Sequence, residues 1–154
     1  MYRSTTALAL TLAAVLPAAA QANPVKLDVT IAQYNGPGTY LAMYLTDKAG
    51  NYATTLWVAG ERTRYYRHLR SWMAANGGQG ADGVTGASVG AGRTLSITAD
   101  IAASMIDAGY VLHIDAAAEN VGESPDEIQV PLTSAGANAP VAGNGFIANF
   151  QYGL

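Results

Sequence analysis

Apolar and polar side chains alternate along Val25-Lys26-Leu27-Asp28-Val29-Thr30-Ile31. Successive side chains of a β-strand point to opposite faces, so a period of two predicts a strand with one buried face. The segment 41–45 repeats this period with Leu, Met and Leu. The polar run 47–51 precedes another strand-like segment, 54–58, and is typical of a hairpin turn. We therefore expect antiparallel β-structure in this part of the chain.

Four more strands are expected farther along the chain, and turns rich in Gly, Asn and Pro separate them. They fall at 93–99, 110–116, 127–132 and 146–152. Many short strands joined by such turns indicate a mainly β protein, an immunoglobulin-like antiparallel β-sandwich. We assign 23–154 to a single domain of this kind. The segment 133–145 is rich in Ala, Gly and Asn and is expected to form a long mobile loop.

One segment departs from the strand pattern. Tyr65, Leu69 and Trp72 recur at the spacing of one helix face, and Asn76-Gly77-Gly78 supplies a stop signal. This pattern predicts one α-helix inserted in the sandwich, at about 63–75, with its aromatic stripe packed on a sheet.

Residues 1–22 have the features of a cleaved signal peptide. Arg3 supplies a positive start, 7–16 form a short apolar core, and Ala20-Gln21-Ala22 suits a signal peptidase. The apolar run is too short to serve as a lasting transmembrane anchor. We therefore expect a protein that is exported to the periplasm, cleaved after Ala22, and not embedded in the membrane.

Composition excludes several classes of function. Once Arg3 is removed with the signal peptide, seven Lys and Arg remain against eleven Asp and Glu, which argues against a nucleic-acid partner. The chain has no cysteine, so it forms no disulfide, no cysteine-bound iron–sulfur cluster and no covalent haem attachment through thiols. A redox role would need another cofactor, and flavin is compatible with these exclusions.

The segment Asp82-Gly83-Val84-Thr85-Gly86-Ala87-Ser88 is the most informative for function. It matches the acceptor motif of extracytosolic flavin transferases: Asp, any two residues, Ser or Thr, Gly, Ala, and a final Ser or Thr. The motif places FMN on its last residue, which is Ser88 here, with Thr85 as the competing hydroxyl. A run of Gly, Ala, Ser and Thr is also typical of an ordinary surface loop, which is the alternative interpretation.

The residue types of the motif suit the chemistry of attachment. Gly83, Gly86 and Ala87 have almost no side chain, so the backbone is expected to enter a narrow enzyme cleft and to adopt turn conformations. Asp82 and Thr85 are expected to hold that turn through hydrogen bonds to nearby backbone.

Aromatic and basic residues near the motif are candidates to contact a flavin. Stacking on its ring is possible for Trp57, Tyr65, Tyr66 and Trp72, although aromatic residues at helical spacing more commonly pack in the core. Pairing with its phosphate is possible for Arg62, Arg64, Arg67 and Arg70, although a solvated helix face is the more common role of such charges.

The histidines give no sign of a metal site. His68, His113 and Asp115 lack the close spacing of a metal-ligand motif, so we expect no bound metal. A hydrolase built on His68 and Asp82 would lack a third catalytic member. We assign no catalytic residue and expect a redox carrier rather than an enzyme in its own right.

From about Tyr40 to Glu123, the chain resembles the periplasmic proteins of domain-of-unknown-function family 2271 (DUF2271). The resemblance is carried by Thr55-Leu56-Trp57, the helical segment 65–72, the motif 82–88 and Ala116-Ala117-Ala118-Glu119. It implies an exported β-sandwich that a flavin transferase modifies with FMN. It also implies that Asp82 contacts the metal-bearing site of that transferase. Relatives often end the motif in Thr, whereas this chain has Ser88, which offers the same hydroxyl chemistry.

The same resemblance implies a partner, because such proteins are associated with PepSY-type transmembrane reductases that carry electrons across the inner membrane. We therefore expect a periplasmic electron-transfer flavoprotein with FMN on Ser88. The alternative is a non-redox β-sandwich that binds or scaffolds other molecules without a cofactor, since this fold class serves many functions.

Overall fold

The computed structural model describes residues 21–81 and 83–154. The predicted signal peptide, apart from its last two residues, lies outside the described residues, and so does Asp82.

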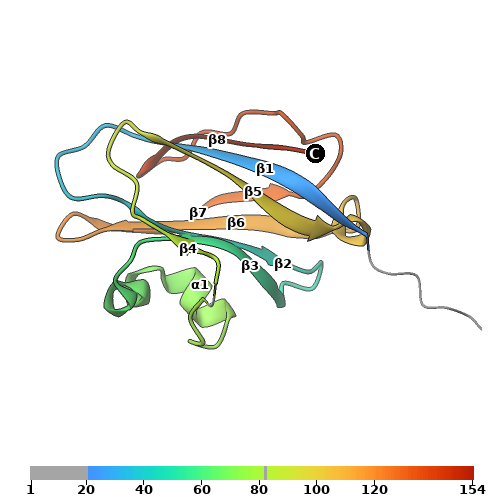
Figure 1. Ribbon diagram of the computed structural model, residues 1–154, viewed down its shortest axis with the longest axis horizontal. Coiled ribbons are helices and arrows are strands. Elements are labelled where there is room, and N and C mark those ends of the chain that lie inside the picture. The colour runs from blue at the N-terminus through green and yellow to red at the C-terminus, as the bar shows by residue number, and fades with distance from the viewer. Residues whose placement is uncertain (1–20, 82) are drawn as a thin grey trace, which may run out of the picture.

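Two β-sheets pack face to face (Figure 1). The three-stranded sheet has the order β5-β1-β8, formed by Thr94–Ala102, Ala22–Ile31 and Ile147–Gly153. The five-stranded sheet has the order β4-β3-β2-β6-β7, formed by Thr85–Gly86, Tyr52–Ala59, Tyr40–Thr46, Val111–Ala118 and Gly122–Pro131. Neighbouring strands are antiparallel except β3 and β4. The predicted mainly β sandwich is therefore confirmed.

The inner faces of the two sheets form the main core. The four apolar residues of β1 are at most 1 % exposed, as their alternation predicts; they are Val25, Leu27, Val29 and Ile31. The predicted hairpin is also present, because β2 and β3 are antiparallel neighbours and the N–H of Asp47 donates to the C=O of Asn51. All seven predicted strands exist, and β7 starts five residues earlier than expected because 122–124 pairs with β6 beyond an irregularity in the ladder.

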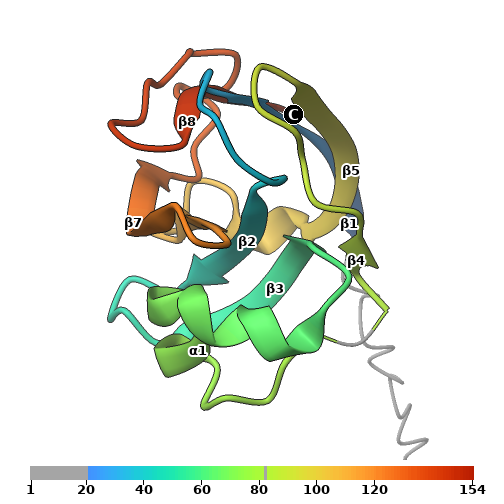
Figure 2. The same ribbon diagram turned by 90° about the vertical axis from the view of Figure 1, so that its left-hand side faces the viewer.

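The central strand of the five-stranded sheet, β2, is buried on both faces. Leu41 and Met43 of β2 point into the main core, whereas Ala42 and Tyr44 point the other way, into an outer cluster with Trp72. Figure 2 shows the helical segment that covers this outer face, beneath β2 and β3. Because both faces of β2 are covered, apolar residues occupy both sets of alternating positions in this strand.

The predicted single helix at 63–75 is wrong in one respect, because the segment forms two short helices. A 3₁₀-helix, η1, spans Thr63–His68, and an α-helix, α1, spans Arg70–Ala75. Leu69 between them has non-helical backbone angles (φ −87°, ψ 73°) and a fully buried side chain. Burying Leu69 in the outer cluster therefore breaks the helix at that residue. A second short 3₁₀-helix, η2, spans Ala103–Met105.

The long segment 133–145 contains no helix or strand, and a bridge between Val141 and Phe150 ties it to β8. Its mobility stays a prediction. In the part of the chain that the structure describes, no helix is long and apolar enough to cross a membrane.

Candidate functional site

The motif segment, residues 83–88, runs along the edge of the five-stranded sheet. The N–H of Val58 donates to the C=O of Val84 at 2.8 Å, and the N–H of Gly60 donates to the C=O of Gly86 at 2.7 Å. The next anchor is the pair Thr39 and Val89, whose backbones exchange two hydrogen bonds of 2.7 and 2.9 Å. The motif segment is therefore not a loop throughout, because two of its residues, Thr85 and Gly86, form the short strand β4.

Ser88 lies between these two anchors with its side chain at the surface. Thr85, Ala87 and Ser88 are exposed, whereas the following Val89 is buried in the main core. Among the described residues, the Ser88 hydroxyl makes no hydrogen bond. A Cβ atom on Gly38 would stand 2.5 Å from Ser88 Oγ. The hydroxyl therefore fits against the backbone at position 38 only because that residue is Gly.

The two glycines of the motif segment have different roles. Gly83 has a φ of +74°, so it adopts the left-handed turn conformation expected of it. Gly86 lies instead in a strand, and a Cβ atom there would stand 2.7 Å from Cζ2 of Trp57. The turn expected at Gly86 is therefore wrong: its missing side chain admits the Trp57 ring.

A groove of about 320 Å³ opens beside Ser88. This site groove is lined by Pro37, Gly38, Tyr40, Glu61, Arg62, Ala87, Ser88 and Glu119. It brings together segments that are distant in sequence: the 37–40 turn, the 61–62 approach to η1, the motif segment and the end of β6.

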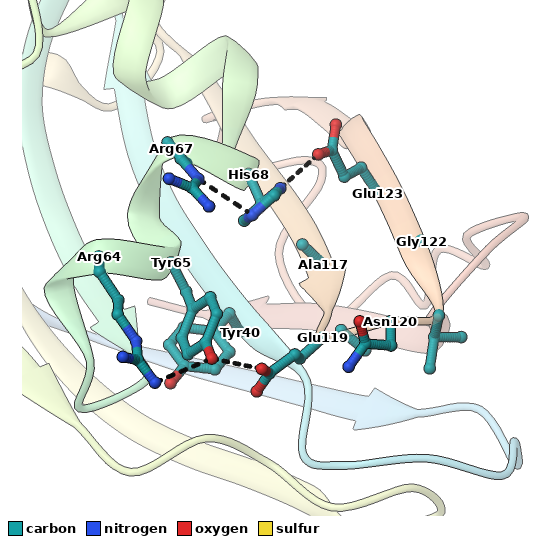
Figure 3. A pocket seen from close by; sticks show the side chains of 12 residues that line it. Tyr40, Arg64, Tyr65, Arg67, His68, Ala117, Glu119, Asn120, Gly122 and Glu123 are labelled. Carbon is teal, nitrogen blue, oxygen red and sulfur yellow. Dashed lines mark hydrogen bonds and ion pairs between the residues drawn. The ribbon is translucent and has the colours of Figure 1, made fainter.

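A larger hollow of about 760 Å³ lies next to the site groove, and Tyr40 and Glu119 line both (Figure 3). One side of the hollow is η1, and the other is the turn between β6 and β7. This volume is within the range of about 300–1,000 Å³ typical of small-molecule sites.

The structure does not bring all the predicted aromatic residues to this region. Trp72 is fully buried and Tyr66 is 4 % exposed, and both pack in the outer cluster. The Trp72 indole N–H donates to Thr55 Oγ1 at 2.9 Å, and the Tyr66 hydroxyl donates to the C=O of Gly60 at 2.8 Å. Trp57 lies against Gly86. Only Tyr65 of the four lines the hollow.

The arginines also divide between different surroundings. Arg62 lines the site groove, and Arg64 and Arg67 line the hollow. Arg70 instead pairs with Glu123, with 2.5 Å between its Nε and Oε2. The hydrogen bond from His68 and the charge of Arg70 hold the pKa of Glu123 below its usual value.

Tyr40, Glu119 and Val121 also line the region, and no sequence pattern marks them as site residues. Tyr40 begins a strand and is one of nine tyrosines, while Glu119 and Val121 lie at a hairpin turn. Only the pairing of β6 with β2 and β7 places them beside η1.

His113 and Asp115 belong to a separate polar cluster in the sheet. His113 Nδ1 lies 3.0 Å from Asp126 Oδ1, its Nε2 lies 2.9 Å from Thr46 Oγ1, and its ring stacks on Tyr44. Burial raises the pKa of the fully buried Asp115. Within 21–81 and 83–154, no group of three or more His, Asp or Glu side chains is placed to hold a metal ion.

Comparison with known families agrees with the resemblance and extends it. The family described as "Predicted periplasmic protein (DUF2271)" matches residues 22–149, so the chain belongs to that family. Neither the curated proteins nor the solved structures contain a match to the chain.

Proposed function

We propose that this chain, as a member of the DUF2271 family of predicted periplasmic proteins, is an electron-transfer protein that carries FMN on Ser88. FMN would be joined to the serine oxygen through a phosphoester. The observation that supports this most is the exposed Ser88 hydroxyl at the edge of the site groove, on a segment with little side-chain bulk.

Attachment requires a flavin transferase with FAD as the donor. Ser88 Oγ would attack the phosphorus atom of the FMN half of FAD. The new oxygen–phosphorus bond forms, the pyrophosphate bond to AMP breaks, AMP leaves, and the hydroxyl proton is released. An exposed acceptor oxygen without a hydrogen bond to any described residue needs no rearrangement of its own to react, which favours Ser88.

The residues around Ser88 are compatible with the linked group. The phosphodiester carries one negative charge, and Arg62 lines the site groove without an ion pair to any described carboxylate. Its guanidinium is suited to a phosphate oxygen. Glu61 and Glu119 line the same groove with the opposite charge, so Arg62 is the lining residue that favours the phosphate.

Electrons would come from a PepSY-type transmembrane reductase. When attached, the flavin supplies reversible acceptance of electrons, while the protein supplies its position, its exposure and the surrounding charge. The surface position of Ser88 supports this role, because electron transfer between proteins requires a cofactor that a partner can approach. An immunoglobulin-like arrangement of the sandwich is part of the same proposal.

The test is the intact mass of the protein after production with a flavin transferase. We expect wild-type protein to gain the mass of FMN less one water, and Ser88→Ala to lose that gain completely. Thr85→Ala is the matched control, because it removes the other exposed hydroxyl of the motif segment and should leave the gain unchanged.

An adduct that persists in Ser88→Ala and disappears in Thr85→Ala would move the attachment site to Thr85. The absence of any adduct on folded wild-type protein, with an active transferase present, would overturn the proposal. That result would favour the non-redox binding or scaffold module.

A further inference from the structure

The hollow beside the site groove owes its depth to small residues at the end of β6 and the start of β7. Ala117, Ala118 and Gly122 form part of its lining, and the two alanines are at most 5 % exposed. Because these residues leave the sheet surface flat, η1 on the other side encloses a space rather than packing against it. A flat base of this kind suits a planar ligand.

Two tyrosines form an aromatic wall of the hollow. The rings of Tyr40 and Tyr65 lie 5.7 Å apart between centroids in an edge-to-face arrangement, and Arg64 lies over the Tyr65 ring at 4.9 Å. In Figure 3 the two rings overlap, and Glu119 lies next to them. Val121 also lines the hollow; it is 45 % exposed and is one of two large exposed apolar residues among those described. Aromatic and apolar surface that faces solvent within a hollow favours a ligand with a π-face.

The charges in the hollow do not balance. Glu123 is paired with Arg70 and His68, whereas Glu119 keeps its negative charge, because the Tyr65 hydroxyl that donates to it is neutral. Arg64 and Arg67 also line the hollow, and neither forms an ion pair with a carboxylate in the described part of the chain. The hollow therefore keeps two guanidinium groups against one carboxylate, Glu119, and this net positive charge can interact with an anionic ligand.

We infer that the hollow holds the ring system of the flavin carried by Ser88, an inference that depends on the proposed function. Tyr40 and Glu119 line both spaces, so the hollow adjoins the site groove at Ser88. Tyr65 and Val121 contact the ring, and Arg64 and Arg67 set its redox preference. Two-electron reduction with uptake of one proton leaves one negative charge on the ring, and nearby guanidinium groups stabilise that charge.

The test compares flavin-loaded wild-type protein with the double variant Arg64→Gln/Arg67→Gln in a reductive titration. We expect the equilibrium ratio of reduced to oxidised flavin, at a fixed potential, to be about tenfold lower in the variant. For a two-electron couple this corresponds to a midpoint reduction potential lower by about 30 mV. Lys26→Gln is the matched control, since it removes one positive charge from β1 in the other sheet and should leave the midpoint unchanged.

Flavin fluorescence supplies a second readout that does not depend on charge. A tyrosine in contact with a flavin ring quenches its emission, so Tyr65→Leu is expected to raise the emission of the linked flavin. All three variants must first show the full mass gain. If the adduct forms and neither the midpoint nor the emission changes, the ring lies outside the hollow and this inference is overturned, while the proposed function stands. If wild-type protein forms no adduct, the proposed function fails, and this inference fails with it.

Discussion

Gly86 is the residue of the motif segment with the least room for a side chain. A Cβ atom there would stand 2.7 Å from Trp57 Cζ2, closer than real Cβ contacts allow. We expect Gly86→Ala to lower the free energy of unfolding by about 1–3 kcal/mol, because the added methyl forces the indole or the edge strand to shift. Urea denaturation measures the change.

The physical cause of this effect can be separated from a general intolerance of side chains in β4. Trp57→Leu shortens the side chain that Gly86 contacts, so the double variant Gly86→Ala/Trp57→Leu should be less destabilised than the sum of the two single changes. Strict additivity of the three unfolding free energies would show that Trp57 is not the restricting group.

At the scale of elements, Asp115 of β6 connects two neighbouring elements. Its Oδ2 accepts the N–H of Trp72 in α1 at 2.9 Å, and its Oδ1 accepts the N–H of Asp126 in β7 at 2.8 Å. An asparagine keeps only one acceptor, so Asp115→Asn leaves one buried N–H unpaired and should cost about 1–3 kcal/mol of stability.

The pH dependence of that cost follows from the raised pKa of Asp115, which burial causes. For a carboxyl group whose pKa is raised by folding, the contribution to stability is complete at pH values below the unfolded-state pKa of 3.8. It is lost as the pH rises through the folded-state pKa. Asparagine does not titrate. The stability advantage of wild type over Asp115→Asn should therefore be larger near pH 4 than at pH 7, as measured by urea denaturation.

Asp47 is the matched control with the opposite sign. Hydrogen bonds from Asn51, first through its backbone and then through its side chain, hold the pKa of Asp47 below its usual value. Its contribution is therefore present above the unfolded pKa and lost as pH falls through the folded one. The advantage of wild type over Asp47→Asn should shrink on acidification. A wild-type advantage over Asp115→Asn that also shrinks would contradict the assignment of Asp115 as a desolvated carboxylate.

The elements that the sequence predicts well are those whose residues carry their own periodicity. The alternation at 25–31 predicts β1 because one face of that strand is buried and the other is not. The break at Leu69 and the strand β4 have no such local signal, because each depends on a distant partner: the outer cluster for Leu69, and β3 for Thr85 and Gly86.

The same distinction applies to the candidate site. The motif at 82–88 predicts Ser88 as the attachment residue from local sequence alone, and this stays a prediction for a residue that the structure shows to be exposed. The hollow depends on Tyr40, which pairing of β2 with β6 brings next to Ala117, and on Val121 in the turn that follows β6. The residues that line the hollow have no fixed spacing in the sequence, so no local sequence pattern could have predicted that they lie together.

At the scale of the whole molecule, Ser88 lies beside the five-stranded sheet, whereas Leu27 belongs to β1 of the three-stranded sheet. Ser88 is held by backbone bonds to β3 and to Thr39, whereas Leu27 is fully buried between the sheets on β1. Leu27→Ala should lower the free energy of unfolding by about 2–5 kcal/mol, because it removes packed methyl groups and leaves a cavity. The local pairing around Ser88 should remain intact in the molecules that stay folded.

This separation predicts when modification occurs. Because Ser88 is already exposed in the folded domain, the transferase needs no unfolding of the segment. We therefore expect purified, folded Leu27→Ala protein to gain the FMN mass at the wild-type rate when incubated with transferase and FAD, with mass spectrometry following the time course. If β4 had to separate from β3 first by global unfolding, the destabilised variant would be modified faster, since a loss of 2–5 kcal/mol raises the unfolded population by roughly 30-fold or more. A rate that increases with the unfolded fraction would thus show that the enzyme acts on the chain before the sandwich forms.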